Sequence, residues 1–193
     1  MKITDHQDSV TRLIADVRGI AEAHPHLIHT WRFAASALWA MRQYYTTRLD
    51  DSTHFDDSSY VIDTFNNLEA LRDDKPLSPN WMRGFWFNAA IMRLDGLWER
   101  CFKVIVTNAA DRRNGPTLYR KCCQALEIPG DYRQSPYCKV RRIVNQLKHV
   151  EHGASADNRE HPDLPIELLN ALLVVIRHSQ FANGVSRLST DHQ

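Results

Sequence analysis

The side chains best suited to phosphate and proton chemistry gather in one segment, Arg141–His152. In an α-helix, with about 100° between successive residues, Arg142, Asn145 and His149 fall within roughly 60° of arc. An arginine binds a phosphate through two parallel hydrogen bonds, and a histidine exchanges a proton near neutral pH. The amide of Asn145 would orient the histidine or a phosphate oxygen. This spacing predicts a catalytic site for phosphate-ester chemistry that needs no metal and no cofactor.

The same helix supplies further cations and a core-facing side. We expect Arg141, Lys148 and His152 to extend the polar stripe, with Arg141 and Lys148 following a nucleic-acid backbone as positive charges. The loop residues Arg112 and Arg113 are additional candidate phosphate contacts. The opposite side of the helix is apolar, as expected for burial, and comprises Val140, Ile143, Val144, Leu147 and Val150. The simpler alternative is a solvated helix face, with His149 interacting with the helix dipole.

Periodicity elsewhere also predicts helices, and no segment alternates long enough for a strand. A capping box at Thr4–Gln7 would begin the first helix, and Ser78-Pro79 and Ser135-Pro136 each pair an N-cap with a first-turn proline. The expected helices cover about Thr4–Ala23, Leu27–Leu49, Ser59–Arg72, Pro79–Ala110, Thr117–Leu126, the segment from Pro136, and Leu164–Asn183 closed by Gly184. The expected fold is all-α: a bundle of four main helices plus accessory helices. It forms a single domain, 1–193, with about the last eight residues flexible.

Charge is unevenly distributed although the formal net charge is only +1. Asp50–Lys75 holds eight acidic and two basic residues, whereas Asp111–Lys148 holds nine basic and three acidic ones. Opposite poles of this kind suit binding to a polyanion or pairing between two copies. The acidic segment Asp50–Asp74 is equally compatible with a partner site, an autoinhibitory cover or plain surface.

Composition indicates a cytoplasmic protein without a membrane segment. The N-terminus lacks the apolar core of a signal peptide, and no apolar run is long enough to cross a bilayer. Cys101, Cys122, Cys123 and Cys138 form no Cys-x-x-Cys pair. We expect them to be reduced structural thiols.

Two other constellations carry less specific signals. His149, Glu151 and His152 lie close together, yet they lack the His-Glu-x-x-His spacing that places two metal ligands on one helical face. A metal would therefore need ligands from other helices. The aromatic residues of the longest helix suit packing better than base stacking, although part of the set would also suit a dimer surface: Trp81, Phe85, Trp86, Phe87 and Trp98.

The segment ending Asn145-Gln146-Leu147-Lys148-His149 resembles the HEPN superfamily (higher eukaryotes and prokaryotes nucleotide-binding domains). Its signature is an arginine followed after four to six residues by a histidine, and six residues separate Arg142 from His149. Ile143 stands where the family often has Asn, Asp or His; Asn145 would supply that polar group from the next turn. The resemblance implies a helical homodimer in which two copies of the motif face each other across a composite cleft.

The resemblance also implies an activity. Many HEPN proteins are metal-independent endoribonucleases of prokaryotic defence or toxin–antitoxin systems, which makes RNA and an antitoxin the expected partners. The alternative is a non-catalytic helical module that binds nucleotide, RNA or a protein partner through the basic Arg141–His152 helix face. A third possibility, from a different class, is an enzyme with a metal in the bundle core.

Overall fold

The computed structural model describes residues 3–47, 65–66, 68–106, 114–149 and 162–177. Within these ranges the chain forms helices and turns and no β-strand, which confirms the predicted all-α class. No helix in these ranges is both long and apolar enough to span a bilayer.

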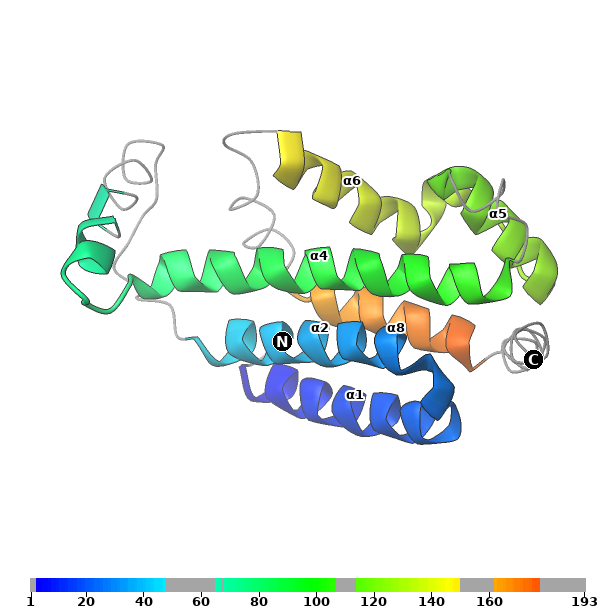
Figure 1. The fold of residues 1–193 in the computed structure, drawn as a ribbon, viewed down its shortest axis with the longest axis horizontal. Coiled ribbons are helices and arrows are strands. Elements are labelled where there is room, and N and C mark those ends of the chain that lie inside the picture. The colour runs from blue at the N-terminus through cyan, green and yellow to red at the C-terminus, as the bar shows by residue number, and fades with distance from the viewer. Residues whose placement is uncertain (1–2, 48–64, 67, 107–113, 150–161, 178–193) are drawn as a thin grey trace.

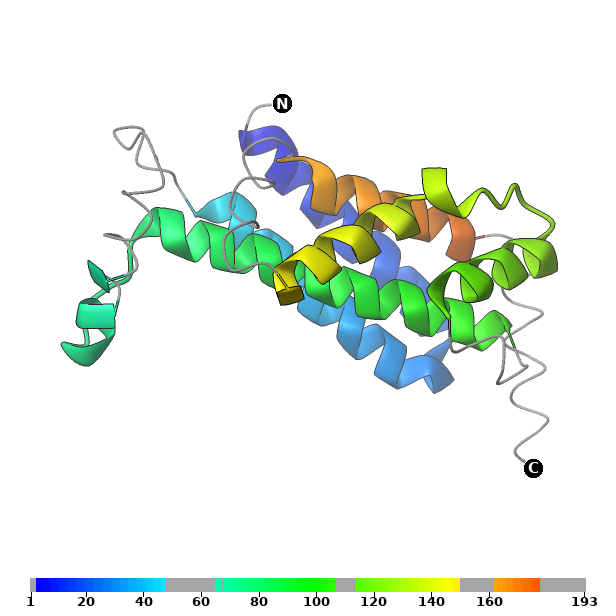
Figure 2. The ribbon, with the colours of Figure 1, turned by 90° about the horizontal axis from the view of Figure 1, so that it is seen from above.

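The longest helix lies at the centre of the bundle. This helix, α4 (Pro79–Ile105), contacts α2 (Ile28–Thr46) and α8 (Leu164–Ile176), and α1 (Ile3–Ala23) packs against both of those helices. On the other side of α4 lie α5 (Gly115–Leu126) and α6 (Pro136–His149), as Figure 1 shows. Short 3₁₀ turns join neighbouring helices: η1 (Pro25–Leu27) precedes α2, and η2 (Tyr132–Gln134) precedes α6. Figure 2 shows α6 crossing obliquely over α4, and α6 also contacts α8.

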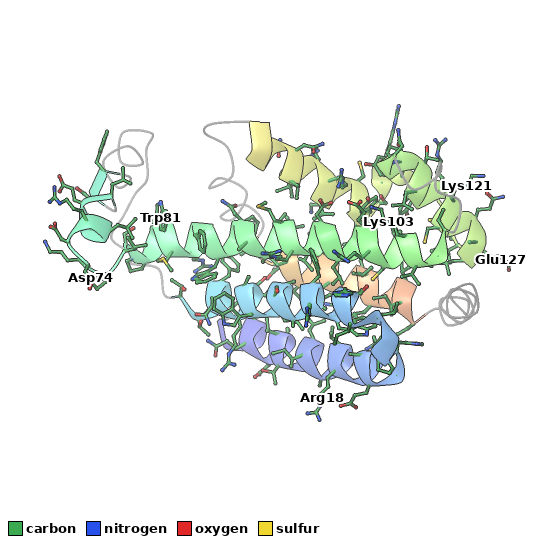
Figure 3. All side chains as sticks on the ribbon, viewed as in Figure 1. Arg18, Asp74, Trp81, Lys103, Lys121 and Glu127 are labelled. Carbon is green, nitrogen blue, oxygen red and sulfur yellow. The ribbon has the colours of Figure 1, made fainter. Side chains whose placement is uncertain are left out.

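The packing of the longest helix divides its aromatic residues into two groups. Phe87 and Trp98 are fully buried, as expected for core residues. Phe85 is 48% exposed, so this aromatic residue lies on the surface rather than in the core, and Met92 on the same helix is equally exposed. Trp81, labelled in Figure 3 near the start of α4, stacks on Phe85 and is itself partly exposed. The exposed stripe results from α4 being covered on only part of its circumference.

Several helix boundaries differ from the sequence-based expectation. The helix α4 ends at Ile105 rather than near Ala110, and Val106 has an extended backbone. Consecutive β-branched residues there have restricted rotamers in a helix. The helix α5 begins at Gly115, two residues earlier than expected, because the Asn114 side chain accepts a hydrogen bond from the Thr117 amide at 3.3 Å and caps it. At the N-terminus, α1 already includes Ile3, so the expected cap at Thr4 lies inside the helix.

Several other expectations fall largely outside the described residues. Of the predicted helix Ser59–Arg72, residues 65–66 and 68–72 are helical, and Phe65, Leu68 and Leu71 are exposed. Most of the acidic segment lies outside the description, as do the chain beyond Arg177 and the predicted helix end at Gly184. The helix α2 ends at Thr46 rather than near Leu49, because Thr47 has an extended backbone.

Candidate functional site

The helix α6 starts at a well-defined cap. The Ser135 hydroxyl accepts a hydrogen bond from the Cys138 amide at 3.0 Å and donates one to the Tyr132 carbonyl at 2.6 Å. Pro136 occupies the first helical position, where its missing N–H costs nothing. This arrangement confirms the predicted start of the helix and fixes its first turn against η2.

The two sides of α6 differ as the sequence predicts. Val140, Ile143 and Val144 are buried, at 0%, 3% and 2% exposure. Arg142 and Asn145 are exposed on the outer side. His149 is the last residue of the helix, one turn beyond Asn145 along α6, while the side chains of Leu147, Lys148 and His149 are outside the described set. The structure therefore places Arg142 and Asn145 on the outer side of α6, and His149 at the end of the same helix.

Arg141 does not share the surroundings of Arg142. Its Nη1 atom donates to the Asp95 carboxylate at 3.0 Å and 3.3 Å and lies 3.4 Å from Glu99 Oε2. Asp95 is a buried carboxylate on α4, and Glu99 also pairs with Lys103. Figure 3 labels Lys103 on the side of α4 that faces α5 and α6. Arg141 is thus tied to α4 by an ion pair, and it does not extend the exposed stripe as the sequence suggested.

A pocket of about 390 Å³ opens beside the first turns of α6, between this helix, η2 and α8. Arg142 lines it together with Arg133 and Lys139, and Glu167 supplies a single carboxylate against these three cations. The remaining lining residues are Gln134, Ser135, Pro136, Cys138, Leu164 and Leu168. Leu164 and Leu168 are each 1% exposed and give the pocket an apolar wall. An anionic group with an apolar part attached, such as a nucleotide, matches this lining.

Sequence reasoning missed Arg133, Lys139 and Glu167 as site residues. The basic segment included Arg133 and Lys139, and Lys139 stands three residues before Arg142, which puts the two on neighbouring turns of one helix side. That spacing was an available signal. The sequence gives no comparable signal for the contribution of α8, because periodicity identifies a helix without showing which helix packs beside it.

Other predicted site residues are not placed by the structure. Arg112 and Arg113 lie in the undescribed segment 107–113, and Glu151 and His152 lie in 150–161. Asn145 is exposed but does not line the pocket. Among the described residues, no group of three or more His, Cys, Asp or Glu side chains is arranged to hold a metal ion.

The cysteines behave as structural thiols in the described fold. All four are free, and Cys101, Cys122 and Cys123 are buried. Burial raises the pKa of Cys101 to about 12, so this thiol stays protonated at neutral pH. Cys138 is partly exposed and is the cysteine that lines the pocket.

The chain was compared with protein-family models, with curated proteins and with solved structures, and none of the three comparisons gave a match. The HEPN resemblance therefore rests on the Arg142–His149 motif and on its helical setting alone.

Proposed function

We propose that this protein is a metal-independent endoribonuclease of the HEPN type, acting through the outer side of α6. The observation that carries the proposal is the cationic pocket at the start of α6, because Arg142 belongs both to this pocket and to the Arg142–Asn145–His149 stripe. Three cations against one carboxylate favour a phosphate-bearing ligand. An RNA strand bound along α6 would pass from the pocket toward the position of His149 on the last turn.

Each residue of the stripe has a role in this proposal. Arg142 binds the scissile phosphate and stabilises the negative charge that develops as the 2′-hydroxyl attacks. His149 moves the proton as general acid or base, and Asn145 orients the histidine or a phosphate oxygen. Lys148 contacts the RNA backbone. Two copies of the stripe would face each other in a homodimer, and a prokaryotic defence or toxin–antitoxin system with a cognate antitoxin is the proposed setting.

The second candidate is a non-catalytic module that binds RNA or nucleotide. The pocket itself favours it, because cations around an apolar wall of Leu164 and Leu168 are sufficient to hold a nucleotide without any proton-transfer group. In that case the stripe would add binding energy, and His149 would have no chemical role.

Both candidates are tested first by RNA binding. Anisotropy of a fluorescent single-stranded RNA oligonucleotide should report weaker binding by Arg142→Ala and Lys139→Ala. Each variant should also lower the slope of log affinity against log salt by about 0.7, since one fewer phosphate contact releases one fewer counterion. Arg32→Ala, an exposed arginine on α2, is the matched control and should bind like the wild type. Equal binding by all four proteins would remove the pocket from both proposals.

Cleavage then separates the two candidates. The endoribonuclease predicts that His149→Ala binds RNA like the wild type and does not cut it. The non-catalytic module predicts that neither protein cuts RNA, while the Arg142 and Lys139 variants still bind it more weakly.

A further inference from the structure

The pocket beside α6 carries opposite charges on its two sides. Its three cations come from α6 and η2, whereas its carboxylate, that of Glu167, comes from α8, a helix that contacts α6. Within the part of the chain that the structure describes, no ion pair joins Glu167 to Arg142 or to the other two cations. Both kinds of charge therefore remain available to a bound molecule.

Glu167 stands on the same side of α8 as the apolar wall of the pocket. Leu164 precedes it by three residues and Leu168 follows it directly, so the three positions fall within about 100° of arc. Glu167 is exposed in the first turn of α8, where the helix dipole favours its negative charge. A flat base packed on the two leucines would bring its polar edge within reach of Glu167, while an attached phosphate would face the cations of α6.

A carboxylate distinguishes the four RNA bases by the donors on their Watson–Crick edges, because its two oxygens only accept hydrogen bonds. Guanine offers two adjacent donors, the N1–H and the 2-amino group, which match the two oxygens of a carboxylate. Adenine and cytosine each place a ring-nitrogen acceptor beside their amino group, and uracil flanks its N–H with two carbonyls. An acceptor that faces a carboxylate oxygen repels it, so guanine is the base that Glu167 pairs with fully.

We propose that the pocket beside α6 recognises a guanine nucleotide, with the base edge paired to Glu167 and the phosphate held by Arg142 and Lys139. The inference rests on the proposed function, since it names the nucleotide that the same RNA site prefers. Glu167 is then a specificity-determining residue and takes no part in proton transfer. The preferred substrate is RNA with an unpaired guanine, because a paired guanine has its Watson–Crick edge covered.

The test is isothermal titration calorimetry of the whole protein with GMP, IMP and AMP. IMP is the matched probe, because it differs from GMP only in lacking the 2-amino group. The wild type should bind GMP about tenfold more tightly than IMP, the usual value of one hydrogen bond to a charged group. AMP should bind more weakly than IMP, because its N1 atom directs a lone pair at the carboxylate.

Glu167→Gln separates recognition of the base from simple repulsion of the phosphate. Glutamine keeps the length of the side chain but only one acceptor oxygen, beside an NH₂ donor. The variant should bind GMP about tenfold more weakly than the wild type does, should no longer distinguish GMP from IMP, and should bind AMP more tightly. If Glu167 only repelled the phosphate, the same variant would bind all three nucleotides more tightly, GMP included.

Variants elsewhere in the chain control the test. Asp8→Asn removes an exposed carboxylate from α1 and should keep the wild-type preference for GMP. Arg142→Ala and Lys139→Ala should weaken all three nucleotides by the same factor, because the three share one phosphate, and should leave the ratio of GMP to IMP affinity unchanged. Thermal unfolding of each variant verifies that it is folded.

Equal affinity of the wild type for GMP and IMP would overturn the proposal. A GMP affinity that Glu167→Gln leaves unchanged or increases would do the same, as would a wild type that binds none of the three nucleotides. These measurements involve neither RNA binding nor RNA cleavage. If RNA is bound and cut as proposed while the three nucleotides bind alike, only the preference for guanine is lost and the proposed function stands.

Discussion

Arg141 and Arg142 are adjacent in the chain but lie in opposite surroundings. Arg141 pairs with a buried carboxylate on α4, whereas Arg142 is exposed at the edge of the pocket. A turn of about 100° along the helix separates the two directions. The first residue therefore holds the helix in place, and the second is available to a ligand.

This contrast predicts different effects on stability. Arg141→Ala should lower the free energy of unfolding by roughly 2–3 kcal/mol, because Asp95 would stay buried without its arginine; the partial exposure of Arg141 keeps the cost below that of a fully buried pair. Arg142→Ala should change the free energy of unfolding by less than about 0.5 kcal/mol. Urea unfolding of the two variants measures both changes in the free energy of unfolding. Equal values for the neighbours would contradict the assigned ion pair.

The buried thiol of Cys101 predicts a pH dependence of stability. Burial raises the pKa of Cys101 to about 12, whereas a thiol in the unfolded chain has a pKa of about 8.5. The raised pKa stabilises the fold fully below pH 8.5. The contribution is lost as pH rises toward 12, at up to about 1.4 kcal/mol per pH unit, because only the unfolded chain ionises.

Urea unfolding of the wild type and of Cys101→Ala at pH 7.5 and pH 10 measures the contribution of the Cys101 thiol to stability. The stability advantage of the wild type should shrink by about 2 kcal/mol over that interval. The buried tyrosines are common to both proteins and cancel in the difference. An advantage that does not change with pH would show that Cys101 ionises equally in both states.

At the scale of the element, the cap of α6 connects stability to the site. Ser135 fixes the first turn, and four of the pocket-lining residues follow it within α6. Ser135→Ala should cost about 1–2 kcal/mol of unfolding free energy and should also weaken RNA binding, since Lys139 and Arg142 lose a fixed support. Ser9→Ala is the control: its hydroxyl bonds to a carbonyl on the exposed side of α1, and its loss should be nearly neutral. Urea unfolding measures the stability of the two variants, and fluorescence anisotropy measures their affinity for RNA. A Ser135→Ala variant that binds RNA like the wild type would show that the cap does not support the site.

The sequence predicted where most of the described helices lie, but it did not predict which helices pack against one another. The Ser135-Pro136 start and the buried side of α6 follow from capping chemistry and periodicity, which act within a few residues. The Asp95–Arg141 pair links residues 46 positions apart, and the pocket needs Leu164 and Glu167 from α8. Such contacts depend on which helices pack together. No local pattern in the sequence encodes that information.

The whole molecule presents α6 on the outside of the bundle, with α4 and α8 beneath it. If RNA binds along α6 as proposed, an exposed stripe on a single chain would leave one side of the RNA strand open to solvent. A second copy would close it, as the HEPN resemblance implies, and would face its own α6 across the RNA.

The proposed dimer predicts that activity depends on protein concentration. Light scattering should give twice the chain mass of 22.4 kDa, and RNA cleavage per chain should fall on dilution as the dimer dissociates. A monomer whose specific activity is independent of concentration would show that one copy of the stripe is sufficient.

The measurement that tests the central claim most directly is cleavage of RNA in EDTA by the wild type and by His149→Ala, with Arg32→Ala as the control. The account predicts cleavage by the wild type and the control, products ending in a 2′,3′-cyclic phosphate, and no cleavage by a folded His149→Ala. Cleavage by His149→Ala at the wild-type rate would contradict it, because the outer side of α6 would then not be the catalytic site.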